Sequence, residues 1–156
     1  MSEPYEELFE GELCLRLPPN PRHEEICQRL HTRMAASIAG VTVTQLLPPR
    51  SKFKFAREIV LRPDLALVTA ATGKLWLAAE IVNSGDHSPD TVTKKGYYEE
   101  IGLPRLWMVD PRYDNVEIYH GGQHGLTLKG ILAVKEVLSE PLLPGFRYLI
   151  DELFKT

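Results

Sequence analysis

The stretch Arg-Pro-Asp-Leu-Ala-Leu-Val at residues 62–68 decides the fold of this chain, together with the mostly apolar run Leu75–Val82 that follows it. Both runs are short and bounded by turn residues. Such runs are typical of strands that are buried on both faces at the centre of a sheet. Leu106–Val109 is a third run of this kind, and Asp110-Pro111 closes it. These segments predict the middle of a β-sheet.

Two longer segments predict helices beside that sheet. Between residues 22 and 39, apolar side chains recur in steps of four along one helical stripe, namely Ile26, Leu30, Met34 and Ile38. Ser88-Pro89-Asp90 is a strong helix start, because serine caps free backbone donors and proline suits the first helical position. That helix is expected to run to Ile101 and to stop at Gly102.

The remaining segments complete an α/β fold. Further strands are expected at residues 11–17, 41–47 and 51–61, and a hairpin at 115–120 and from 126 onward. Pro141–Gly145 predicts a turn, and residues 149–154 a short closing helix. This order predicts a central mixed β-sheet flanked by α-helices. The length of 156 residues and the lack of a linker predict a single domain over residues 1–156.

Composition and charge narrow the class of protein. The hydrophobic fraction of 44% and charged fraction of 25% are ordinary for a soluble globular domain. A net charge of -3 excludes a strongly basic nucleic-acid coat protein. One local basic segment holds Arg50, Lys52, Lys54 and Arg57. It indicates either a local nucleic-acid contact or a solvated edge strand that resists aggregation.

The cellular compartment is also an expectation from composition. The sequence has two cysteines, Cys14 and Cys27, which form no metal-binding or disulfide pattern. No apolar run approaches the roughly 18–20 residues of a membrane span, and no signal-peptide pattern opens the sequence. We therefore expect a cytoplasmic protein in a reducing environment.

Two acids stand out because they lie in apolar strands. Asp64 opens one such strand after Pro63, where its alternative role is a turn or capping aspartate. Glu80 lies inside the next strand and shares a face with Ala78 and Val82. A carboxylate there must be paired, protonated or bound to a metal, and its alternative role is a buried ion pair. Two acids on neighbouring strands are typical of a divalent-cation site.

The helix after Glu80 carries a polar stripe. Asp90, Lys94 and Tyr98 are spaced by four and therefore share one helical face. The plainer interpretation is an ordinary surface pair between Asp90 and Lys94. Lys95 points about 100° away from Lys94 and is expected to be solvated.

An ordered set of motifs resembles a large bacterial family of restriction-endonuclease-like nucleases of the PD-(D/E)-x-K superfamily. The set comprises residues 62–68, Ala-Glu-Ile-Val-Asn-Ser at 79–84, Asp90-x-x-x-Lys94-x-x-x-Tyr98, and Gly-Leu-Pro-Arg-Leu-Trp-Met-Val-Asp-Pro at 102–111. Gly-Glu-Leu at 11–13, His23 and Pro-Leu-Leu-Pro-Gly-Phe at 141–146 extend the resemblance over nearly the whole chain.

The resemblance implies a Mg²⁺ (or Mn²⁺) site that hydrolyses DNA phosphodiester bonds with metal-activated water. Carried onto this chain, the metal ligands are Asp64, Glu80 and the backbone carbonyl of Ile81. The superfamily's usual lysine two residues after the acid is Val82 here. Lys94, extending from the following helix, is predicted to fill that catalytic position. We expect Lys94→Ala to abolish cleavage while sparing the fold, and Lys95→Ala to do little.

Several alternatives stay open at this point. His23 either approaches the site from the first helix or simply bonds to backbone as a helix-start histidine. The chain is a metal-dependent nuclease, a catalytically inactive binding or scaffold domain, or a structural homodimer whose acids pair with arginines. For the nuclease, we expect the Asp64 and Glu80 carboxylates within about 8 Å of each other, since Mg²⁺ ligand bonds are about 2 Å long. We also expect a homodimer, with the hairpin near Tyr119 and the basic segment near Lys54 as candidate edges.

Overall fold

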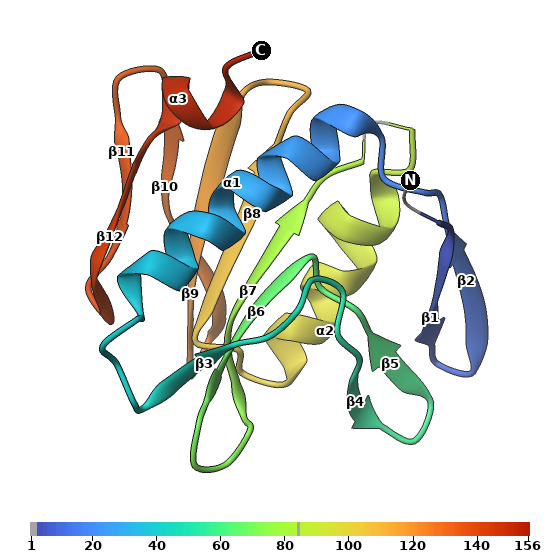
Figure 1. Cartoon of the computed structure of the whole chain (residues 1–156). Helices are drawn as coiled ribbons and strands as arrows, with labels where there is room; N and C mark the ends of the chain where they lie inside the picture. The colour runs from blue at the N-terminus through green and yellow to red at the C-terminus, as the bar shows by residue number, and fades with distance from the viewer. Residues whose placement is uncertain (1–2, 84) are drawn as a thin grey trace.

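A six-stranded mixed sheet forms the centre of the computed structural model, which describes residues 3–83 and 85–156 (Figure 1). In spatial order its strands are β10 (Gly125–Ala133), β9 (Asn115–Gly122), β8 (Arg105–Asp110), β7 (Leu75–Ile81), β6 (Leu65–Thr69) and β3 (Thr44–Leu46). β7 and β8 are parallel, whereas the other neighbours are antiparallel. The three apolar runs are therefore the adjacent strands β6, β7 and β8, as predicted.

A smaller four-stranded sheet lies to one side, with the order β2 (Glu12–Arg16), β1 (Tyr5–Phe9), β5 (Ile59–Leu61) and β4 (Phe53–Ala56). The sequence analysis missed β1. It joins β2 through a tight turn in which Glu10 and Gly11 both have positive φ, 51° and 86°. The predicted strand 51–61 is in fact the β4–β5 hairpin, because its pairing brings Phe53 opposite Leu61.

The C-terminal region adds a two-stranded hairpin of β11 (Val137–Glu140) and β12 (Leu143–Leu149), followed by α3 (Ile150–Phe154). β12 begins at Leu143, so the predicted turn at Pro141–Gly145 is shorter than expected. Tyr148 and Leu138 are paired and buried in this hairpin, which packs over the central sheet. The short closing helix is confirmed.

The first long helix is α1 (Pro21–Ser37), and Asn20 caps it by accepting the His23 backbone N–H at 2.8 Å. The second is not a regular α-helix. It begins as a π-helical turn, η1 (Pro89–Lys94), and continues as α2 (Lys95–Glu100). Such π turns occur frequently at functional sites. No helix among the described residues is both long and apolar enough to span a membrane.

Each face of the central sheet is covered, which explains why its strands are apolar on both sides (Figure 1). On β7, Leu77, Ala79 and Ile81 pack with α1 and the C-terminal hairpin. Ala78 and Val82 belong to the opposite core, together with Tyr98 of α2. The predicted alternation of β7 is confirmed, and it turns Glu80 toward the face that α2 covers.

Candidate active site

Asp64 and Glu80 lie on neighbouring strands at the same level of the sheet. β6 and β7 are antiparallel, with Leu65 opposite Ala79 and Ala66 opposite Ala78. Asp64 immediately precedes Leu65, and its carboxylate accepts the backbone N–H of Ile81, the residue after Glu80, at 2.8 Å. Both acids are buried, with 2% and 1% of their surface exposed.

Asp64 is held in place by protein donors on both carboxylate oxygens. Its Oδ2 accepts the backbone N–H of Ile81 at 2.8 Å, and its Oδ1 accepts Nη1 of Arg50 at 3.1 Å. Burial by itself would raise the pKa of Asp64. The positive charges of His23, Lys94 and Arg50 outweigh that effect and hold the pKa well below its usual range. Asp64 is therefore an ionised carboxylate inside the protein.

His23 reaches the site from the first turn of α1. Its Nε2 lies 2.9 Å from the carbonyl oxygen of Ile81 and 3.4 Å from Oδ2 of Asp64. Both neighbours are acceptors, so Nε2 carries a proton. Burial opposes the charged form, but the Asp64 carboxylate prevails and raises the pKa of His23. Both alternatives for His23 are thus realised at once, since the residue bonds to backbone and also contacts Asp64.

Glu80 has one occupied and one unoccupied carboxylate oxygen. Its Oε2 accepts the Tyr98 hydroxyl at 2.5 Å and forms an ion pair with Nζ of Lys94 at 2.7 Å. Its Oε1 is buried and has no hydrogen-bond partner within the described residues. Burial and the neighbouring carboxylates, opposed by Lys94, raise the pKa of Glu80 to about 8. Buried polar atoms normally have a partner, so this unpaired Oε1 is the atom of the site that is best suited to bind a further ligand.

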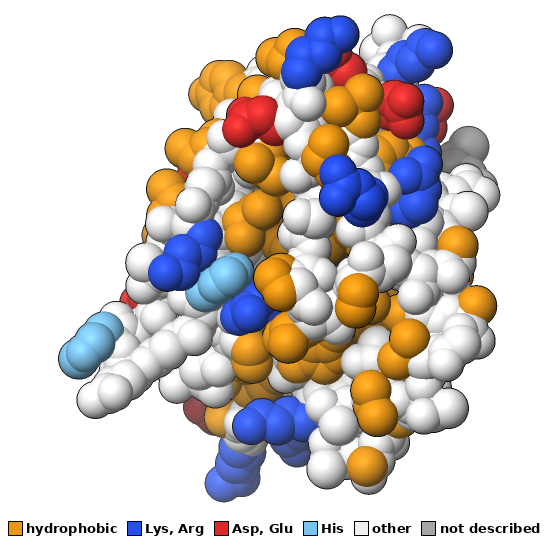
Figure 2. Space-filling view, turned by 90° about the vertical axis from the view of Figure 1, so that its left-hand side faces the viewer, with side chains coloured by type: hydrophobic (Ala, Val, Ile, Leu, Met, Phe, Trp, Pro, Cys, Tyr) orange, Lys and Arg blue, Asp and Glu red, His pale blue; other side chains and the backbone are white. Residues whose placement is uncertain are grey.

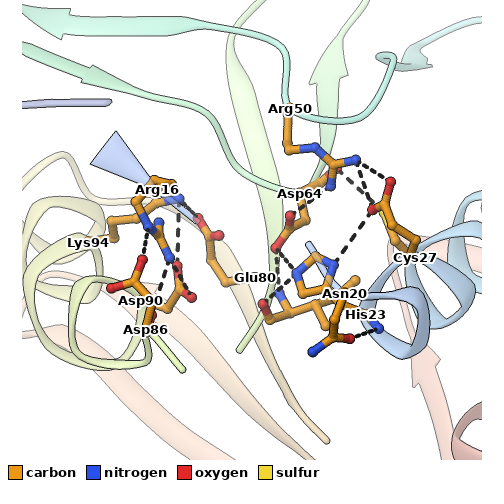
Figure 3. A network of polar contacts seen from close by, with 12 residues as sticks. Arg16, Asn20, His23, Cys27, Arg50, Asp64, Glu80, Asp86, Asp90 and Lys94 are labelled. Atoms are coloured by element: carbon orange, nitrogen blue, oxygen red, sulfur yellow. Dashed lines mark hydrogen bonds and ion pairs between the residues drawn. The ribbon is translucent and has the colours of Figure 1, made fainter. Parts of the chain in front are cut away.

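Lys94 is fully buried among carboxylates (Figure 3). Besides Glu80, its Nζ lies 2.8 Å from Oε2 of Glu7 and 4.0 Å from Oδ1 of Asp90. Burial disfavours the ammonium, but the carboxylates of Glu80, Glu7 and Asp90 raise its pKa well above the usual value. The sequence-based expectation that Lys94, Asp90 and Tyr98 meet is confirmed, although Lys94 ends a π turn rather than lying within an α-helix.

Sequence reasoning missed the charges that hold Lys94. Arg16 of β2 is almost fully buried, and it donates to Glu7 at 2.6 Å and to Asp86 and Asp90 at 2.9 Å each (Figure 3). Glu7 belongs to β1, the strand that was not predicted. Glu10 before Gly11, just ahead of the alternating segment 11–17, is the turn signal that could have revealed this hairpin.

The ion pairs join six acids to four basic side chains, namely Glu7, Glu24, Asp64, Glu80, Asp86 and Asp90 with Arg16, His23, Arg50 and Lys94. The residues between 3 and 156 that the structure describes contain no ready-made group of three or more His, Cys, Asp or Glu ligands. A metal would therefore depend on backbone or solvent oxygens as well.

One expectation outside this cluster, the solvation of Lys95, needs correction, whereas the two candidate edges do lie at sheet edges. Lys95, expected to be solvated, is half-buried with its Nζ 4.3 Å above the Tyr119 ring, a distance at which the cation is attracted to the ring. Tyr119 itself lies on β9 inside the central sheet, so the free edge of its hairpin is β10. β4, which carries Lys54, is indeed an edge strand.

The surface carries no broad basic face on the side of β10 and the β11–β12 hairpin. Figure 2 shows Lys and Arg side chains interspersed there with hydrophobic and neutral ones. In the basic segment, Arg50 turns inward to Glu24 and Asp64. Lys52, Lys54 and Arg57 remain exposed.

Comparisons with known proteins agree with this architecture. The chain resembles a crystal structure from Anabaena variabilis ATCC 29413, described as a "putative nuclease belonging to DUF820". The TM-score is 0.81 at 15% sequence identity, covering 98% of this chain and 91% of that one, which establishes a shared fold. No curated protein matches the chain. Residues 2–151 match the model of the Uma2 family, described as "Putative restriction endonuclease". Since that match spans most of its length, the chain belongs to the Uma2 family of restriction-endonuclease-like proteins.

Proposed function

We propose that this chain is a Mg²⁺- or Mn²⁺-dependent nuclease that hydrolyses DNA phosphodiester bonds. The observation that carries the proposal is the buried contact of Lys94 Nζ with Glu80 Oε2 at 2.7 Å. It supports the proposal because an acid and a lysine meet there, and because a second acid, Asp64, bonds to the backbone of Ile81, the residue after Glu80. Family membership and the shared fold support a nuclease-like function.

Asp64, Glu80 and the carbonyl of Ile81 would hold the metal. The buried Oε1 of Glu80, which has no hydrogen-bond partner among the described residues, fits a divalent cation. The Asp64 oxygens and the Ile81 carbonyl already accept protein donors, yet each oxygen has a second lone pair for a cation. When bound, such a metal polarises the phosphodiester and makes water a better nucleophile at neutral pH.

The chain's own residues have distinct roles in this proposal. Lys94 keeps its proton because Glu80 and Glu7 lie beside it, so it can stabilise negative charge that develops on the phosphate. Tyr98 orients Glu80 by donating to Oε2. The Nε2–H group of His23 donates a hydrogen bond to the carbonyl oxygen of Ile81 and lies against the Asp64 carboxylate. These contacts orient two of the proposed metal ligands. The exposed Lys52, Lys54 and Arg57 are suited to contacts with the DNA backbone.

A cleavage assay tests the proposal. Supercoiled and linear DNA are incubated with the protein and Mg²⁺ or Mn²⁺, and EDTA serves as the metal-free control. We expect nicked or linear products with wild type and with Lys95→Met, but none with Asp64→Asn or Lys94→Met. Cleavage that survives in Asp64→Asn would contradict the assigned role of that carboxylate.

The alternative is a catalytically inactive binding domain. This alternative is favoured by the hydrogen bonds that Asp64 already makes, because each of its carboxylate oxygens accepts one protein donor, from Arg50 or from Ile81. Calorimetric titration with Mn²⁺ separates the two functions, because the nuclease requires binding that Glu80→Gln weakens. Free thiols at Cys14 and Cys27 accord with the reducing cytoplasm, where we place either activity.

A further inference from the structure

We propose that two copies of this chain associate edge to edge through β2. This strand ends the small sheet and lies outermost, away from the central sheet (Figure 1). Leu13, Leu15 and Leu17 project from one side of it and are 69%, 66% and 49% exposed. The proposal concerns assembly and does not depend on whether the chain cleaves DNA.

The strand at the other edge of the same sheet, β4, carries a charge that protects it from pairing with another strand. There, β4 presents exposed Lys54 in the same sheet row as Val60 and Leu8. Lysine on an edge strand discourages association with another strand. The equivalent position on β2 is Leu13, which pairs with Leu8 and is more than two-thirds exposed. β2 therefore lacks the charge that would keep its outer face solvated.

The strand Glu12–Arg16 is complementary to a second copy of itself. Antiparallel pairing about Cys14 sets Leu13 of one copy opposite Leu15 of the other, so that four leucines cluster on the outer face. Arg16 takes no part in this contact, because its side chain is buried against Glu7, Asp86 and Asp90 of its own chain. A twofold axis through Cys14 relates the two copies, as in most closed soluble dimers.

This contact is continuous with the candidate active site. Arg16 lies on β2, and its guanidinium holds both Glu7 and Asp90 beside Lys94. Glu7 is paired with Cys14 across the β1–β2 ladder. Pairing of two β2 strands would hold the two ionic clusters on either side of the axis.

Measuring the molecular mass in solution tests whether β2 mediates the association of two copies. By analytical ultracentrifugation at micromolar concentration, we expect a wild-type dimer and a Leu15→Lys variant whose dissociation constant rises at least about tenfold. Leu142→Lys is the matched control, because Leu142 is 58% exposed but lies between β11 and β12. Circular dichroism verifies that each variant is folded. A wild-type monomer, or a dimer unaffected by Leu15→Lys, overturns the proposal.

Oxidative cross-linking through Cys14 tests independently the register in which the two β2 strands pair. Opposed Cα atoms about 4.5–5.5 Å apart satisfy disulfide geometry. Mild oxidation with copper phenanthroline should therefore link two copies through Cys14. We expect this product from Cys27→Ser, whose replaced thiol is buried, and none from Cys14→Ser. Failure of Cys27→Ser to cross-link would overturn the pairing about Cys14.

Discussion

Lys94 Nζ lies 2.7 Å from Oε2 of Glu80, with both side chains shielded from solvent. The superfamily pattern expects the lysine on the same strand as the acid, but Val82 occupies that position. Here the ammonium arrives from the π turn η1, which packs over the face of β7 that carries Glu80. The pair therefore forms between two elements, and its geometry depends on how they pack.

Replacing Lys94 is expected to cost stability as well as any activity. Lys94→Met leaves Glu7 and Glu80 buried without their cation, which should lower the free energy of unfolding by about 3–5 kcal/mol. This changes the sequence-based expectation that the fold is spared. Urea denaturation measures the loss, and Lys95→Met should change stability by less than about 1 kcal/mol. Equal losses in the two variants would contradict the buried ion pair.

Arg16 should prove more important for stability than an exposed arginine. Arg16→Met removes the shared partner of Glu7 and Asp90 and should also destabilise the fold by about 3–5 kcal/mol. The control is Arg22→Met, because Arg22 pairs with Asp114 at a site where the side chains are 34% and 58% exposed. Its loss should stay below about 1 kcal/mol in chemical denaturation. A comparably small effect for Arg16→Met would mean that the buried network contributes little.

Tyr98 offers a finer test of how Glu80 is oriented. Tyr98→Phe keeps the ring but removes the hydroxyl donor to Oε2, which above about pH 8, where Glu80 is ionised, should cost about 1.5–3 kcal/mol as a hydrogen bond to a charged group. Tyr119→Phe is the matched control, since its hydroxyl donates to Glu117 at 3.2 Å in a part-buried position. Thermal melts of both variants should separate them clearly. Indistinguishable melting temperatures would argue against a strong bond from Tyr98.

The stability of the metal-free protein should decrease as the pH rises from about 4.5 to about 8. Burial raises the pKa of Glu80 from 4.5 to about 8, so over this interval the folded state binds more protons than the unfolded state. The free energy of unfolding then falls with rising pH. Urea denaturation in EDTA should show a shallower decline for Glu80→Gln. A variant curve parallel to wild type would exclude Glu80 as the titrating group.

Asp64 should act in the opposite direction at acidic pH. Although burial opposes it, the charges of His23, Lys94 and Arg50 hold its pKa below the usual 3.8. Its contribution to stability is thus present above about pH 4 and is lost as the pH falls further. Acid unfolding monitored by circular dichroism should show a smaller pH-dependent loss below pH 4 for Asp64→Asn. An unchanged acid transition would show that other carboxylates dominate it.

The sequence predicted most of the central sheet, because its signals are local. Leu65–Thr69 and Leu75–Ile81 are apolar over short, turn-bounded runs, and both became central strands. Glu80 was identifiable for the same reason, since a lone acid in such a strand needs a partner. β1 was not predicted, because five residues with mixed polarity carry a weak alternation signal.

What the sequence determined by itself was the three central strands, the face on which Glu80 lies, and the family motifs that include Asp64 and Lys94. Which charges surround Lys94 was decided only by the tertiary structure. Glu7 and Arg16 reach it from the small sheet, and pairing between distant strands determines that placement. Local propensity acts over a few neighbouring residues, whereas the protonation of a buried group depends on every charge packed around it. The ionic cluster is therefore a property of the folded chain that no single segment encodes.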